Sequence, residues 1–251
     1  MSPRGAAYVI AATAVAMLAL VGCDAMPGRP RPADHPPLPS QVMDFAELYG
    51  QSCAGCHGRD GRLGAARPLH DPIYLALIPP DRLRMIIAQG VPGTAMPGFA
   101  AAAGGPLTEA QIDALVHEMR QRWGRPAPSP DVPLPPYAAG GMAANGSPAG
   151  DAEHGLRVYA EACASCHGAD GKGGAKGGSV VDAAYLALVS DQALRTAVIV
   201  GRTDLGKPDW RSYIPGRPLT AQQISDVVAW LVSQRQPVVG RSATSGYVGR
   251  P

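Results

Sequence analysis

The sequence predicts an all-α protein made of two tandem copies of one small domain. The first observation is an internal repeat, because residues 48–62 resemble residues 158–172, at an offset of 110 residues. The second is that apolar residues near the end of each copy recur at the spacing of a helix, while no pair of alternating segments predicts a β-hairpin. A chain of 251 residues is long enough for two domains of this size.

The repeat divides the chain into segments. We name the first copy, residues 41–124, module 1, and the second copy, residues 150–236, module 2. The segment 125–149 between them is rich in proline, glycine and alanine, which is typical of a linker. Residues 237–251 are rich in glycine, serine and arginine and are expected to form a flexible tail.

Each module is expected to contain three main helices. A short helix leads into a cysteine-containing motif, a second helix lies in the middle, and a longer one ends the module. The last helix begins at a Thr-x-x-Gln pattern that predicts a capping box, Thr108 with Gln111 and Thr220 with Gln223. The first two helices are expected at about 42–52 and 80–89 in module 1, and at about 154–162 and 191–200 in module 2.

The N-terminus has the pattern of an export signal, residues 1–22, in which Arg4 precedes an apolar run. The run ends in LVGC, which resembles the lipobox of bacterial lipoproteins and implies cleavage before Cys23 and acylation of that cysteine. The alternative is an uncleaved helical anchor, for which the run is only marginally long. Residues 23–40 are rich in proline and predict a semi-rigid tether. In the lipoprotein sorting rules of enteric bacteria, an aspartate directly after the acylated cysteine implies retention at the inner membrane, and Asp24 stands there. The expected location is therefore the periplasmic face of the cytoplasmic membrane.

Composition restricts the function of the chain. A formal charge of +2 and the lack of basic runs argue against nucleic-acid binding. Aromatic residues make up only 5% of the chain, so side chains alone would fill two cores poorly. A bulky apolar cofactor in each module would supply the missing volume.

Two Cys-x-x-Cys-His motifs identify that cofactor. Module 1 contains Cys53, Cys56 and His57, and module 2 contains Cys163, Cys166 and His167. The pattern is that of covalent haem c attachment, in which two thiols add to the vinyl groups of the porphyrin and the histidine ligates the iron. A thioredoxin-type redox pair would need a βαβ context, and a zinc site would not explain the duplicated surroundings. The sequence therefore predicts two haems, haem 1 and haem 2.

With these motifs each module resembles class I cytochrome c, and the duplicated chain resembles dihaem cytochromes such as the c4 group. The resemblance implies an all-α fold wrapped around each covalent haem. It also implies that a methionine before the last helix ligates haem 1, and Met96 stands there in the sequence GTAMPGF. In the family a proline carbonyl orients the histidine that ligates the iron, a role that Pro68 would take for His57. Module 2 has Gly177 and Gly178 at that place, which leaves the partner of His167 open.

The sixth ligand of haem 2 is different. Lys207 occupies the place of the methionine, and no methionine follows Met142. Three alternatives remain: Lys207 ligates the iron as a neutral amine, the position is open or water-bound, or a residue from elsewhere such as Met142 or His154 ligates it. A nitrogen ligand would lower the potential of haem 2 below that of a Met-ligated haem.

The expected function is electron transfer rather than catalysis. We expect a membrane-tethered carrier between a quinol-oxidising complex and a terminal acceptor such as an oxidase. The alternative is a haem enzyme, or an electron-transfer subunit of a dehydrogenase, with haem 2 as the catalytic or intake site.

Overall fold

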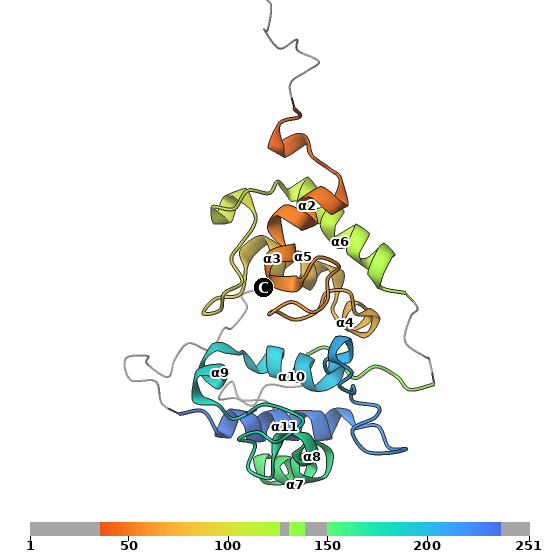
Figure 1. Cartoon of the computed structure of the whole chain (residues 1–251), viewed down its shortest axis with the longest axis vertical. Helices are drawn as coiled ribbons and strands as arrows, with labels where there is room; N and C mark the ends of the chain where they lie inside the picture. The colour runs from red at the N-terminus through yellow and green to blue at the C-terminus, as the bar shows by residue number, and fades with distance from the viewer. Residues whose placement is uncertain (1–35, 126–130, 139–149, 237–251) are drawn as a thin grey trace, which may run out of the picture. The chain divides into compact units, whose positions relative to one another are not determined.

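A computed structural model of the chain describes residues 36–125, 131–138 and 150–236 (Figure 1). The described residues form helices joined by loops, and β-structure in them is limited to isolated bridges. This confirms the prediction of an all-α protein. Two compact units are present, Met1–Val42 and Met43–Pro251, and apart from residues 41 and 42 both modules lie in the second.

Several predictions concern residues outside the described part of the chain. These are the export signal, Cys23, most of the tether, and the tail. Within the described residues, the first unit contains one short 3-10 helix, η3 (Pro39–Gln41). No helix among the described residues is both long enough and apolar enough to span a bilayer.

The two modules contain the same series of α-helices. Module 1 has α2 (Phe45–Ser52), α3 (Ala54–His57), α4 (Pro72–Leu77), α5 (Pro80–Gln89) and α6 (Glu109–Trp123), with the 3-10 helix η4 (Ala101–Ala103). Module 2 has α7 (Ala152–Ala162), α8 (Ala164–His167), α9 (Ala183–Leu188), α10 (Asp191–Val200) and α11 (Ala221–Ser233), with the 3-10 helix η5 (Thr203–Leu205). The modular boundaries themselves stay predictions.

The expected helices are present, and additional short ones accompany them. The middle helices α5 and α10 span the predicted residues, whereas α2 begins later than expected and α7 earlier. The helices α4 and α9 were not predicted, although each follows an aspartate. The carboxylate of Asp71 accepts hydrogen bonds from the first turn of α4, and that of Asp182 does so for α9.

The terminal helices α6 and α11 begin as predicted. The hydroxyl of Thr108 accepts from the backbone N–H of Gln111, whose side chain accepts in return from the N–H of Thr108. Thr220 and Gln223 make the same reciprocal pair. Both capping boxes are therefore confirmed, and each satisfies N–H groups that the helix itself leaves unpaired.

The two cores are built on the contact between the first and last helices. In module 1 the ring of Trp123 packs edge-on against Phe45 and Tyr49, at centroid distances of 5.2 and 5.0 Å. In module 2, α11 lies against α7 (Figure 1), and the rings of Trp230 and Tyr159 are 4.2 Å apart. These contacts bring the helix that leads into each Cys-x-x-Cys-His motif onto the helix that ends the module.

The described part of the linker contacts module 2. The guanidinium of Arg195, in α10, donates to the carbonyl of Pro136 at 3.1 and 3.0 Å, and the side-chain amide of Gln192 donates to the carbonyl of Tyr137 at 2.8 Å. Residues 131–138 are therefore held against α10 by hydrogen bonds to Pro136 and Tyr137.

Candidate haem-binding sites

The two Cys-x-x-Cys-His motifs adopt the same local structure. Cys53 ends α2 and precedes the single turn of α3, and its carbonyl accepts hydrogen bonds from the N–H groups of Cys56 and His57. Cys163 does the same at the end of α7, with the same φ of −122°. The tight turn keeps two thiols and an imidazole close together in each module, as attachment to a single porphyrin requires.

A tyrosine in each module holds the chain just after the motif, and sequence reasoning did not single it out. The hydroxyl of Tyr49 donates to the carbonyl of Gly58 at 2.8 Å, and the hydroxyl of Tyr159 donates to that of Gly168 at 2.6 Å. The signal was available, because a tyrosine stands four residues before the first cysteine in both copies. Each bond fixes the residue that follows the iron-ligating histidine.

No disulfide joins the four motif cysteines, so before haem attachment each supplies a thiol. Burial, followed by the neighbouring Cys56, raises the pKa of the Cys53 thiol to about 11. Burial, followed by Cys166, raises the pKa of Cys163 to about 12. A thioredoxin-type pair works by the opposite shift, because its attacking thiol must ionise near neutral pH. The raised pKa values therefore do not match the lowered pKa of a thioredoxin-type attacking thiol.

The histidines of the motifs are oriented for metal binding. Nδ1 of His57 lies 2.6 Å from the carbonyl oxygen of Arg67, and Nδ1 of His167 lies 2.7 Å from that of Gly178. A carbonyl oxygen only accepts, so the proton is on Nδ1 and the lone pair of Nε2 is left for a metal. Burial is the main cause that lowers the pKa of His57, which favours the neutral imidazole that a metal needs. The donor set fits haem iron in both modules.

The carbonyls that accept from His57 and His167 differ from the prediction for module 1 and identify the partner in module 2. The carbonyl that accepts from His57 belongs to Arg67 and not to Pro68, the residue after it. In module 2 the acceptor is the carbonyl of Gly178. Its neighbour Gly177 lies against the ring of His167, because a Cβ added at Gly177 would be 2.9 Å from Nδ1. Glycines in this loop therefore replace the proline of the family pattern by allowing the backbone to approach the imidazole.

The sixth-ligand residues lie in equivalent turns. Each turn starts at a glycine that ends the middle helix, Gly90 with φ 72° and Gly201 with φ 67°. A Cβ on Gly90 would be 2.5 Å from the backbone of Pro97, and one on Gly201 would be 2.0 Å from the carbonyl oxygen of Pro208. Met96, in the first turn, is partly buried. Its ligation of haem 1 stays a prediction.

Lys207 lies in the second turn and is exposed. Its amine donates to the carbonyl of Lys176 at 2.8 Å, in the loop that also contains the acceptor for His167. Of the proposed outside ligands, His154 has Nδ1 2.6 Å from the carboxylate of Asp226, and Met142 lies outside the described residues. The three alternatives for the sixth ligand of haem 2 therefore stay open.

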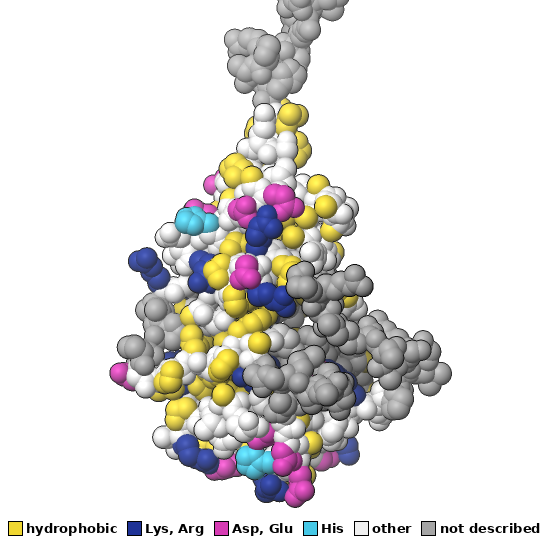
Figure 2. Space-filling view, turned by 180° about the vertical axis from the view of Figure 1, so that it is seen from behind, with side chains coloured by type: hydrophobic (Ala, Val, Ile, Leu, Met, Phe, Trp, Pro, Cys, Tyr) yellow, Lys and Arg dark blue, Asp and Glu magenta, His cyan; other side chains and the backbone are white. Residues whose placement is uncertain are grey.

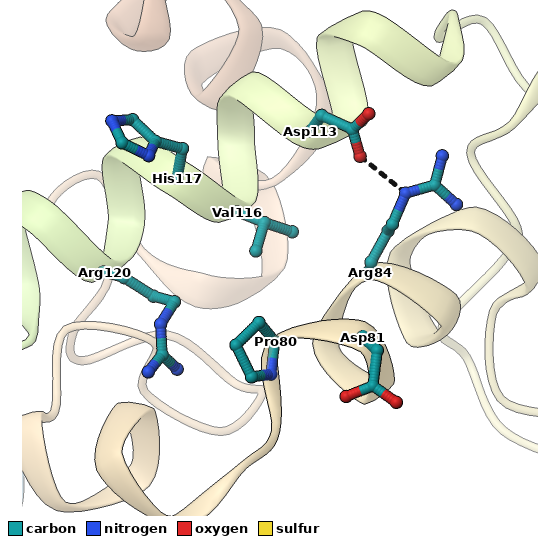
Figure 3. Close-up of a pocket in the computed structure, with 7 residues that line it drawn as sticks. All are labelled: Pro80, Asp81, Arg84, Asp113, Val116, His117 and Arg120. Carbon is teal, nitrogen blue, oxygen red and sulfur yellow. Dashed lines mark hydrogen bonds and ion pairs between the residues drawn. The ribbon is translucent and has the colours of Figure 1, made fainter.

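The hollows in the described surface differ in their relation to the motifs. One, of about 360 Å³, lies between α5 and α6 and is lined by Pro80, Asp81, Arg84, Asp113, Val116, His117 and Arg120 (Figure 3). Arg84 crosses it to Asp113 at 2.5 Å, and none of its lining residues is a predicted haem ligand. Another, of about 620 Å³, begins at Gly58, directly after His57. Its lining includes no predicted haem ligand, although Gly58 is the neighbour of one.

The fold and the two donor sets define a class of protein, a c-type cytochrome with two haem domains. Known proteins agree with this class. Residues 152–235 match the family described as "Cytochrome c", and residues 40–117 match the family described as "Cytochrome C oxidase, cbb3-type, subunit III".

Two curated proteins are similar to the chain. The "Dihydro-heme d1 dehydrogenase" of Pseudomonas aeruginosa is 43% identical over 74 residues, which is 30% of this chain and 14% of that protein. The "Cbb3-type cytochrome c oxidase subunit FixP" of Sinorhizobium medicae is 31% identical over 173 residues, which is 61% of this chain and 50% of that protein. The chain thus spans half or less of the curated relatives that it matches.

Among solved structures, the chain is similar to the Kuenenia stuttgartiensis reducing HAO-like protein complex, with 17% identity and a TM-score of 0.45. That match covers 80% of this chain and 100% of the other.

The chain contains two class I cytochrome c domains in tandem, and it binds two haem c groups covalently. Haem iron supplies one-electron chemistry, so these are electron-transfer domains. The protein residues supply attachment through four thiols and orientation of the two imidazoles through backbone carbonyls.

Proposed function

We propose that this chain is a membrane-tethered electron carrier, which passes electrons from a quinol-oxidising complex to a terminal acceptor such as an oxidase. The observation that supports this most is the 173-residue similarity to a cbb3-type oxidase subunit. The match covers 61% of this chain, which is too long to lie within one module and its flanking segments. The name of that relative favours a terminal oxidase as the acceptor.

The tether is part of the proposal. Acylation of Cys23 would anchor the chain at the periplasmic face of the cytoplasmic membrane, and more than one acyl chain gives stable anchoring. A proline-rich spacer of this length would reach on the order of 50 Å. The two modules would then meet redox complexes of the same membrane at a raised effective concentration.

The surface is consistent with transient docking. Figure 2 shows basic and acidic side chains interspersed on one face, with hydrophobic side chains gathered between them. Leu63 and Leu188 are exposed by 71% and 59%. Small apolar areas with a mixed polar rim are typical of short-lived complexes, which a carrier needs because it must leave its partner after each transfer.

The test uses membranes of a strain that lacks the chain. Oxygen consumption driven by quinol should fall, and the full chain should restore it. A Cys163→Ala/Cys166→Ala chain, which lacks haem 2, should not. A chain in which residues 1–23 are replaced by a cleavable export signal without a lipobox should move to the soluble periplasmic fraction with both haems in place. Quinol-driven oxygen consumption that does not change when the chain is deleted would contradict the carrier proposal.

A second candidate is an electron-transfer subunit of a dehydrogenase, or a haem enzyme, that uses haem 2. Two observations favour it: Lys207 replaces the methionine of the turn, and a relative with 43% identity over 74 residues is named as a dehydrogenase. Rapid binding of carbon monoxide or cyanide by haem 2 in the purified chain would favour this candidate. Two inert low-spin haems would exclude the catalytic form of it.

A further inference from the structure

The turn that contains Lys207 differs from its counterpart in module 1 by the side chains that precede the ligand position. Counting from Gly90 and Gly201, Thr203 corresponds to Pro92, and Asp204 corresponds to Gly93. Pro92 and Gly93 have no side-chain group that can form a hydrogen bond. At these two positions the turn of module 2 therefore has a hydroxyl and a carboxylate, where that of module 1 has neither, and at the ligand position it has Lys207 in place of Met96.

Both of these side chains bond to module 1. The hydroxyl of Thr203 donates to Oδ2 of Asp71 at 2.7 Å, and Oδ2 of Asp204 accepts from the backbone N–H of Leu63 at 3.1 Å. Asp204 is held in place by Arg202, which donates to both carboxylate oxygens at 2.9 and 3.0 Å. The side chain of Asp204 is only 2% exposed, whereas Thr203 and Leu63 are themselves exposed.

The anchor points in module 1 are themselves fixed. Asp71 is 2% exposed, and its other oxygen, Oδ1, accepts from the N–H groups of Ile73 and Tyr74 at the start of α4. Leu63 follows the haem 1 motif and is the one non-glycine residue with a positive φ in the described chain. The turn of module 2 is therefore bonded to a helix start and to the loop after His57.

The turn is rigid enough to pass a displacement on to Lys207. The carbonyl of Arg202 accepts from the N–H groups of Leu205 and Lys207, and that of Thr203 accepts from Gly206. At its far end the amine of Lys207 is bonded to Lys176, two residues before the carbonyl that orients His167. One short turn thus connects module 1 to the ligand side chains of haem 2.

We propose that module 1 positions the sixth-ligand turn of haem 2 through Thr203 and Asp204, which act as positioning residues. The ligation of haem 2 then depends on the docking of module 1, whichever group occupies the sixth position. The Met96 turn has no such bond to module 2 among the described residues, because its hydroxyl, on Thr94, donates to the carbonyl of Val91 and accepts from the N–H of Met96 within the turn.

The decisive variant lies in module 1 and is Asp71→Ser. Serine is as good a helix N-cap as aspartate, so α4 keeps its cap, but its single oxygen leaves none for Thr203. Loss of one such bond changes an equilibrium by about tenfold. In the full holoprotein we expect carbon monoxide to associate with haem 2 about tenfold faster, and the electron paramagnetic resonance signal of haem 2 to change. The signal of haem 1 should stay as in the wild type.

Matched variants distinguish loss of the bond between Asp71 and Thr203 from a general loss of stability. Thr203→Val should reproduce the effect, Thr203→Ser should retain the wild-type signal, and the Asp71→Ser/Thr203→Val double variant should change haem 2 no more than either single variant does. Asp170→Ala removes an exposed carboxylate of module 2 that pairs with Lys172, and it should have no effect on either haem.

If Thr203→Val does not retain two haems by intact mass, Asp204→Ala replaces it in the series. Wild-type signals and carbon monoxide kinetics of haem 2 in Asp71→Ser would overturn the proposal. A change confined to haem 1 would overturn it as well.

Discussion

Modules 1 and 2 share their haem-attachment structure and differ at the sixth-ligand turn. The Cys-x-x-Cys-His turns, the tyrosine hydrogen bond and the capped last helix are the same in both. In the turn, Met96 of module 1 is replaced by Lys207, and the side chains of Thr203 and Asp204, which precede the lysine, bond to the other module. The two modules therefore share the residues that attach haem and differ in the turn that contains the predicted sixth ligand.

The difference shows how one fold can hold two unequal redox centres. Attachment needs thiols and a histidine at fixed spacing, and any change there loses the cofactor. The predicted sixth-ligand residues lie on turns that begin at closely packed glycines, Gly90 and Gly201, so the residues between can change without moving the helices. The predictions below test whether the modules are alike in attachment and unlike in ligation.

The largest effect should follow from loss of haem in one module. In a Cys163→Ala/Cys166→Ala variant we expect the chain to bind one haem and module 2 to lose its cooperative unfolding, since a unit of this size with few aromatics has little core without haem. Intact mass and limited proteolysis measure this. The Cys53→Ala/Cys56→Ala variant should unfold module 1 in the same way, and a module that stays folded without haem would break the comparison.

Exchange of the sixth-ligand residue should move the potentials. Lys207→Met should raise the potential of haem 2 by on the order of 100 mV, within the roughly 0.8 V range that axial ligands span, because a thioether favours ferrous iron. Met96→Lys should lower that of haem 1. A potentiometric titration measures both. Low-spin signals of haem 2 that are the same in Lys207→Ala and in the wild type would show that the lysine is not the ligand.

The aromatic contact between the first and last helices should contribute to both modules. Trp123→Ala and Trp230→Ala are each expected to cost about 3–5 kcal/mol of unfolding free energy, as is typical of large-to-small changes in a core. Denaturant unfolding followed at each haem measures this. Each variant should destabilise its own module, and equal loss in both modules would indicate that they unfold as one.

A smaller difference between the modules should appear in how their unfolding free energy depends on pH. Burial alone would raise the pKa of Asp226, but hydrogen bonds from His154, the N–H of Asp151 and Gln222 lower it below its ordinary value. A carboxyl with a lowered pKa stabilises the fold at neutral pH, and this contribution is lost as the pH falls through its folded pKa. Module 1 has Ala114 at the equivalent position.

The unfolding free energy of module 2 should therefore fall more steeply than that of module 1 as the pH is lowered below the ordinary pKa of an aspartate. Denaturant unfolding followed at each haem at several pH values measures this, and Asp226→Asn should make the slope of module 2 shallower. A slope of module 2 that Asp226→Asn leaves unchanged would show that the assigned role of Asp226 is wrong.

The smallest effect should come from the tyrosines that precede the motifs. Tyr49→Phe and Tyr159→Phe each remove one hydrogen bond to a backbone carbonyl, which contributes about 1 kcal/mol. Thermal unfolding should show a similar loss in both modules. A much larger loss in one module would mean that its tyrosine has a further role.

The sequence predicts the fold where the signal is local. Periodicity and the Thr-x-x-Gln caps place α6 and α11, and the repeat places the two motifs. The short helices α4 and α9 were not predicted, because six residues are too few to show a helical periodicity. Their capping aspartates become recognisable as caps only once the helices are known.

The parts of the haem sites that depend on the type of side chain could be predicted from the sequence. Cysteines and histidines at fixed spacing identify haem attachment, whereas the carbonyl that orients a histidine is supplied by any residue and leaves no trace in the sequence. This is why Pro68 was the wrong choice and Arg67 the right one. The bonds of Thr203 and Asp204 to module 1 join residues more than 130 positions apart, which no local pattern reveals.

The central claim is that the two haems share their attachment and differ in their sixth ligand. Near-infrared magnetic circular dichroism of the oxidised full chain tests it most directly, since it distinguishes thioether-ligated from nitrogen-ligated and high-spin haem. The account predicts one methionine-ligated haem and one haem of another type in equal amounts. Two methionine-ligated haems, or none, would contradict it.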